Sequence, residues 1–175
     1  MALLDIKIYG ESVLRKKSEP IPAVTPELAA LAQDMLETMY DAGGCGLAAP
    51  QIGKDIRLVV IDAAKPDEEE PAPHIMFNPE WGPEPDAVDV IHEEGCLSIP
   101  DIWCDVMRKD KVWVRYTDET GAQQELHNCT DMLGRCIQHE CDHLEGKLFI
   151  DKMSTTDRTL NQSKLRDMAK KHKKA

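Results

Sequence analysis

The sequence lacks any apolar run of about 18 residues, so we expect no membrane-spanning segment. Its first residues do not combine a basic stretch, an apolar stretch and a small-residue cleavage site, which argues against a secretory signal and favours a cytoplasmic location. No internal repeat or low-complexity block is present. A chain of 175 residues has the size of one ordinary domain, and we expect a single domain over residues 1–175.

Positive charge is also scarce. Lys and Arg number 21 against 32 Asp and Glu, a net charge of −11, which argues against a protein built wholly to hold nucleic acid. Residues 164–175 depart from this balance, with six Lys or Arg and one acidic residue. This basic tail is either the solvated end of a helix or a contact for RNA or an acidic partner.

Six cysteines are present. In a cytosolic chain of this length we expect reduced thiols, which either pack in the core or bind a metal, rather than a framework of disulfides.

Hydrophobic periodicity and end signals predict three helices. They span residues 26–42 after Thr25 as N-cap, 130–145 with Thr130 as N-cap and Gly146 as the end, and about 155–175. Strand-like runs occupy residues 57–62, 74–77, 88–92, 111–117 and 123–127, and a loop rich in proline and acidic residues occupies 65–73. This order favours an α+β fold with antiparallel pairing.

The second predicted helix contains His139-Glu140-Cys141-Asp142-His143. Two imidazoles four residues apart share one helix face and can bind one metal ion, although a polar face without metal stays an alternative. A catalytic metal usually has three protein ligands. Phe149 stands where one metalloprotease class has its third histidine, and no glutamate follows Glu145, so the third ligand should lie upstream.

Cys96 is the most suggestive upstream ligand. It lies in the segment Glu93–Pro100, between a strand-like run and a turn that ends in proline. One thiolate and two imidazoles suit Zn(II) or Fe(II). Taken alone, Cys96 could equally be a small buried hydrophobic residue.

A third segment, Gly44–Gln51, combines small residues with a polar end. It lacks the spacing of a dinucleotide loop and the lysine of a phosphate loop. Small residues allow the backbone to approach a ligand closely, and Gln51 offers an amide donor. By itself the segment is also typical of a plain turn before a strand.

Together, the three segments resemble the peptide deformylases of the bacterial type, whose motifs read GxGxAAxQ, EGCxS and HExxH in this order. Every fixed position is matched, at 44–51, 94–98 and 139–143. The resemblance implies an α+β fold in which antiparallel or mixed sheets surround a central helix that carries HExxH, with a further C-terminal helix. It also implies one catalytic domain that removes the N-formyl group from the initiator methionine of new polypeptides and releases formate.

The resemblance also implies roles for individual residues. Cys96, His139 and His143 would be the metal ligands, with Fe(II) as the physiological ion and Zn(II) or Ni(II) as occupants of the purified protein. Glu140 would transfer protons. Gln51 and the backbone N–H of Leu97 would donate to the formyl oxygen, and the backbone of Gly46 would help to hold the substrate.

An apolar slot for the methionine side chain would lie beside the metal. By resemblance its walls are Cys45, His92, Glu94, Met132, Arg135, Cys136 and His139. Arg135 would contribute its aliphatic stem while its charged head reaches solvent, or would simply be a surface residue. Trp103 stands at a variable position, and Asp142 is either a charge partner of the site or a surface residue.

Two other functions remain open at this stage. One is a metallopeptidase that cleaves internal peptide bonds, and the other is a non-catalytic module on the ribosome. The expected partners are formylmethionyl nascent peptides and, through the basic tail, the ribosome. We expect a monomer.

Overall fold

The computed structural model describes residues 2–64 and 70–173. Within these ranges the helices are α1 (Pro26–Asp41), α2 (Asp131–Leu144) and α3 (Thr155–His172). The strands are β1 (Gly46–Ala48), β2 (Leu58–Ile61), β3 (His74–Pro83), β4 (Asp89–Cys96), β5 (Ile99–Lys109), β6 (Val112–Thr117) and β7 (Gln123–Cys129). Residues 65–69 of the predicted acidic loop lie outside the described residues. Among the described residues, no helix is both long enough and apolar enough to cross a bilayer.

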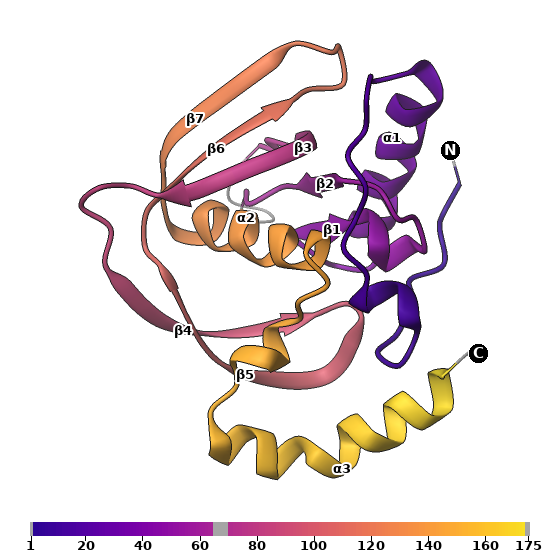
Figure 1. The fold of residues 1–175 in the computed structure, drawn as a ribbon, viewed down its shortest axis with the longest axis vertical. Helices are drawn as coiled ribbons and strands as arrows, with labels where there is room; N and C mark the ends of the chain where they lie inside the picture. Colours follow the sequence, from indigo (N-terminus) through magenta and orange to yellow (C-terminus); the bar gives the residue numbers. More distant parts are fainter. Residues whose placement is uncertain (1, 65–69, 174–175) are drawn as a thin grey trace.

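Helix α1 begins where the sequence predicts. The Thr25 side chain accepts a hydrogen bond from the Leu28 N–H at 3.3 Å, and proline occupies the first turn, where its missing N–H costs nothing. The fully buried Met35 and Met39 pack into a core cluster with residues of β1, β2 and β3. Helix α1 thereby covers one side of these strands (Figure 1).

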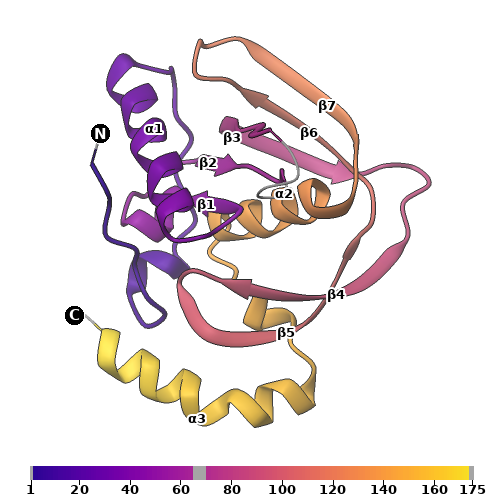
Figure 2. The same ribbon diagram turned by 180° about the vertical axis from the view of Figure 1, so that it is seen from behind.

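Five strands form one antiparallel sheet in the order β1-β2-β3-β6-β7. Ile137 and Leu144 of α2 are fully buried in a second core cluster that includes β2, β3 and β6. In Figures 1 and 2, α2 lies between this sheet and the separate hairpin of β4 and β5. The α+β fold around a central helix that carries HExxH is therefore confirmed.

The hairpin extends beyond the sequence prediction. β4 continues through Cys96, and β5, an antiparallel partner of 11 residues, was not predicted. Its buried positions alternate as Ile102, Cys104, Val106 and Arg108, while the residues between them are exposed. Because Trp103 and Met107 are exposed and Arg108 is buried, apolar and polar residues do not alternate along this strand, which conceals its strand character.

The inner face of this hairpin packs against the C-terminal part of the chain. Phe149 and Ile150 of the 3₁₀ turn Phe149–Lys152 and Leu165 of α3 join β5 in a third core cluster. Helix α3 runs along the outside of β5 (Figure 1).

The ends of α2 differ in how closely they follow the prediction. Thr130 is the N-cap residue, as predicted, but its hydroxyl bonds to Asp131 and makes no hydrogen bond to a backbone N–H of the helix. At the other end, Gly146 adopts φ +67° and a side chain there would lie 2.6 Å from the Arg15 carbonyl oxygen. Glycine alone adopts this positive φ readily and also leaves the space beside the Arg15 carbonyl free, which explains why the helix ends at this point.

Candidate active site

Cys96, His139 and His143 come together in space. One ligand-type atom from each residue lies within 4.8 Å of the others. The Cys96 Sγ is 3.3 Å from the Nε2 of His143, although 47 positions separate the two residues. This set of one thiol and two imidazoles is the donor set of a transition-metal site.

Local geometry explains how the three residues meet. The pairing of β4 with β5 shifts between Glu94 and Cys96, and this irregularity places Cys96 at the tip of the hairpin, opposite Ile99. The rings of His139 and His143 lie one helical turn apart, with centroids 5.1 Å from each other. Phe149 stacks on His139 at 6.1 Å between centroids, so it packs against the site rather than supplying a ligand.

The protonation states of the buried ligands fit a cation. Burial lowers the pKa of His143, which keeps the imidazole neutral and able to coordinate. Burial also raises the pKa of Cys96, so the thiolate form needs a nearby positive charge. A divalent ion between these side chains would supply that charge.

Glu140 lies beside this group. It is 4% exposed, and its Oε2 has no hydrogen-bond partner among the described residues. Burial raises the pKa of this carboxyl group. A Cβ at Gly46 would collide with the Glu140 carboxyl group, so the absence of a side chain at Gly46 gives Glu140 its place.

Gln51 points its amide toward the same group. Its Oε1 accepts a hydrogen bond from the Ala48 N–H at 2.8 Å, which fixes the amide orientation. Its Nε2 then lies 3.2 Å from the Ser98 hydroxyl and 3.5 Å from the Cys96 Sγ. Ser98 is fully buried and positions Gln51, a role that the sequence reasoning did not assign although Ser98 belongs to the second motif.

A cleft of about 940 Å³ opens onto these residues. Its lining includes Gln51, Cys96, Leu97, His139 and Glu140. Six of the seven residues predicted to bind substrate also line it, namely Cys45, Gly46, Glu94, Met132, Arg135 and Cys136. The seventh, His92, is exposed and is not part of the lining, so its place in the slot stays a prediction.

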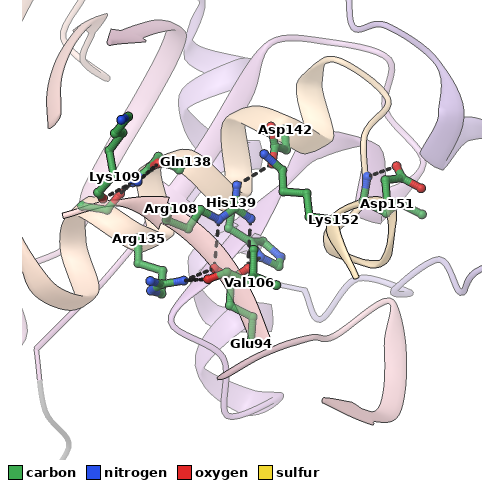
Figure 3. A network of polar contacts seen from close by, with 12 residues as sticks. Glu94, Val106, Arg108, Lys109, Arg135, Gln138, His139, Asp142, Asp151 and Lys152 are labelled. Atoms are coloured by element: carbon green, nitrogen blue, oxygen red, sulfur yellow. Dashed lines mark hydrogen bonds and ion pairs between the residues drawn. The ribbon is translucent and has the colours of Figure 1, made fainter. Parts of the chain in front are cut away.

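Glu94, which also lines the cleft, holds His139 in place. The Nδ1 of His139 lies 3.0 Å from Glu94 Oε2, which leaves Nε2 as the ring nitrogen available to an ion. Arg108 donates to both Glu94 oxygens at 2.9 Å (Figure 3). Burial raises the pKa of Glu94, but the hydrogen bonds from Arg108 and His139 outweigh it and the pKa is lowered.

Arg108 also reaches α2. Its Nη1 donates to Asp142 Oδ2 at 2.6 Å, and its side chain is only 1% exposed. Of the two alternatives for Asp142, a charge partner of the site is therefore correct. Arg108 was not predicted as a site residue, because an arginine at a buried strand position departs from the apolar and polar alternation that marks a strand.

The position of Arg135 corrects an expectation. Its Nη1 donates to Glu94 Oε1 at 2.7 Å and to the Val106 carbonyl at 3.1 Å. The side chain is 11% exposed, so the charged head folds back onto Glu94 instead of reaching solvent. The Glu94 carboxylate therefore contacts three side chains, those of Arg108, Arg135 and His139.

Comparisons with known proteins agree with this geometry. Residues 3–159 match the family model described as polypeptide deformylase. The peptide deformylase of Mesorhizobium japonicum is 46% identical over 170 residues, which covers 97% of this chain and 95% of that protein. The crystal structure of peptide deformylase from Thermus thermophilus has a TM-score of 0.84 at 34% identity, covering 97% of this chain and 99% of that one. The enzyme from Synechococcus elongatus in complex with actinonin has a TM-score of 0.77 at 39% identity, covering 98% and 87%.

Replacing Arg108 by Met should destabilise the protein by about 3 kcal/mol, because removing one partner leaves buried carboxylates without their charge partner. Urea denaturation measures this free energy of unfolding. Arg115→Met is the matched control, since Arg115 pairs with Glu125 on the surface, and it should hardly move the unfolding midpoint. Equal shifts in both variants would contradict a role for the buried cluster.

Proposed function

The chain belongs to the peptide deformylase family and is a hydrolase that removes the N-formyl group from newly made polypeptides, and we propose that it does so in the cleft beside Cys96, His139 and His143. The observation that carries this proposal is the meeting of a strand-borne thiol with two helix-borne imidazoles, of which Cys96 and His139 line that cleft. Because the substrate is a nascent chain, a cytoplasmic location is part of the proposal.

We propose that the three residues hold a divalent metal ion. The donor set fits, and the contact of Glu94 with Nδ1 of His139 leaves Nε2 for coordination. Fe(II) is the proposed physiological ion, and Zn(II) and Ni(II) accept the same ligands in the purified protein. When bound, such an ion supplies Lewis acidity and lowers the pKa of water from 15.7 to about 7.

Glu140 is proposed to carry the proton of the reaction. Its carboxylate, buried next to Gly46, takes a proton from the attacking water and later delivers it to the nitrogen of the leaving amine. Burial excludes bulk water from this transfer, and Gly46 leaves the carboxylate room against the backbone.

The formyl oxygen gains negative charge as the water attacks. The Nε2 of Gln51, already fixed by the contact of its Oε1 with Ala48, is proposed to donate to it. The N–H of Leu97, in the turn between β4 and β5, is the second proposed donor. The backbone of Gly46 is proposed to hold the peptide. The cleft walls, which include Cys45, Met132 and Cys136, are proposed to receive the methionine side chain.

The metallopeptidase hypothesis shares the helix motif but offers no role for the thiol at the tip of the hairpin. The non-catalytic module offers no reason for a buried Glu140 beside the ligand cluster. Both are therefore less well supported than deformylation.

Protein handled without oxygen should release formate from formyl-Met-Ala-Ser and leave Met-Ala-Ser intact. Chelation should abolish the release of formate. Adding back Fe(II), Zn(II) or Ni(II) one at a time, with elemental analysis of the metal bound in each sample, identifies the active ion. Metal-loaded protein that cleaves internal peptide bonds but releases no formate would favour the metallopeptidase instead.

Glu140→Gln should lower turnover by about 100- to 10,000-fold while the metal stays bound, because proton transfer is lost but the ligands are untouched. The control is Glu119→Gln, an exposed residue in the turn before β7, which should behave as the native chain. Loss of metal from the Glu140 variant would assign it a structural role at the metal site.

We also propose that the basic end of α3 contacts the ribosome. Lys170, Lys171 and Lys173 are exposed there, whereas Leu165 is buried in the third core cluster, so truncating the helix would open the core. Changing these three lysines to Glu should therefore weaken co-sedimentation with ribosomes and leave activity on short peptides unaltered. The same change at the exposed Lys16, Lys54 and Lys147 should not weaken it. Equal sedimentation of both variants would reject the contact.

A further inference from the structure

Two thiols from distant parts of the chain face each other in the wall of the cleft. The Sγ atoms of Cys45 and Cys136 are 3.1 Å apart, although 91 positions separate the residues. Cys45 precedes β1, Cys136 lies on α2, and both line the cleft. A disulfide bond is about 2.05 Å long, so a shift of about 1 Å would join the two sulfurs.

The two thiols differ in a way that suits reversible oxidation. Cys45 is exposed, whereas Cys136 is buried. The hydrogen bond from Cys136 lowers the pKa of Cys45 against the opposing effect of desolvation, and the thiolate is the nucleophilic form. An accessible thiol beside a buried second thiol is the arrangement in which an oxidised sulfur is trapped as a disulfide.

The other cysteines have different surroundings. Cys96 contacts His143 at 3.3 Å, and Cys104, Cys129 and Cys141 are buried. Among the described residues, the pair of Cys45 and Cys136 is therefore the one that combines access from the cleft with a partner thiol in reach.

We propose that Cys45 and Cys136 form a reversible modification site, which hydrogen peroxide or another hydroperoxide converts to a disulfide. The Cys45 sulfur attacks one peroxide oxygen, the O–O bond breaks, and a sulfenic acid forms as the first water leaves. The Cys136 sulfur then attacks the Cys45 sulfur, the S–O bond breaks, and the hydroxyl leaves as a second water with the Cys136 proton. In total, two thiols lose two electrons and two hydrogens to one hydrogen peroxide, giving one disulfide and two waters.

The surroundings of Cys45 indicate what the bond would change. A Cβ on Gly44 would lie 2.8 Å from Leu97 Cδ1, and one on Gly46 would collide with Glu140. The segment thus has little room to move against the catalytic wall, and Cys136 lies one helical turn before Glu140. A disulfide would tie the segment to α2 and reshape the wall that receives the first side chain of the substrate, a consequence that rests on the proposed function.

The test uses full-length protein loaded with Zn(II), which has no redox chemistry of its own. After a peroxide titration, intact mass should fall by two hydrogen atoms, and peptide mapping should find Cys45 linked to Cys136 with zinc retained. Formate release should fall by about 10- to 200-fold, the range for an altered substrate pocket, and return with dithiothreitol.

Cys45→Ser and Cys136→Ser should each lose the linkage and the dithiothreitol-reversible inhibition, measured against their own untreated samples. Cys129→Ser, which removes a buried thiol elsewhere, should retain both. Oxygen addition at Cys96 while Cys45 and Cys136 stay free thiols would overturn the proposal. Since mass reports the linkage without any turnover, an untreated protein that releases no formate would reject the proposed function and leave this test intact.

Discussion

The buried carboxylate of Glu94 joins the two parts of the molecule that make the site. It accepts hydrogen bonds from Arg108 on its own hairpin and from Arg135 on α2, and it contacts Nδ1 of His139 on the same helix. Removing a carboxylate from water costs several kcal/mol, and the arrangement is stable only when its oxygens are fully matched by donors. Because Cys96 follows Glu94 by two residues, the contact that orients one proposed ligand also positions another.

Arg108 links Glu94 to a second position on α2. Its contact with Asp142 reaches the turn that contains His143, so one guanidinium fixes the hairpin against both histidine-bearing turns. Gln138 adds a backbone contact, since its side chain bonds to both the N–H and the carbonyl of Lys109. With the third proposed ligand on a strand, the site needs no histidine at Phe149, which lies in the 3₁₀ turn after α2 and packs its ring against His139. The departure from the metalloprotease pattern is thus part of how the site is built.

Local sequence patterns predicted the elements that have strong local signals. Helix α1 has a capping threonine and a proline, and the HExxH helix has periodic apolar residues, so both were found. Strand β5 was missed because its exposed positions include Trp103 and Met107 while its buried positions include Arg108, so apolar and polar residues do not alternate along it. Arg108 and Arg135 could not be placed, because they lie 14 and 41 positions from their partner Glu94. Only the fold determines which long side chain reaches which carboxylate. The single domain and the monomeric state stay predictions.

Three sets of contacts on one face of α2 hold the walls of the cleft together, and each set uses a different chemistry. Ion pairs join α2 to β5, the proposed ligands join it to the tip of β4, and two thiols join it to the segment before β1. Oxidants reach this face from the cleft, where Cys45 is exposed and Cys96 is half-buried against His143. A sulfur engaged with a cation is a poorer nucleophile than a free thiolate, because its electron pair is shared. Exposure and the proposed coordination therefore act in the same direction. Both would direct the first oxidation toward Cys45, where a second thiol can reverse it, and away from Cys96.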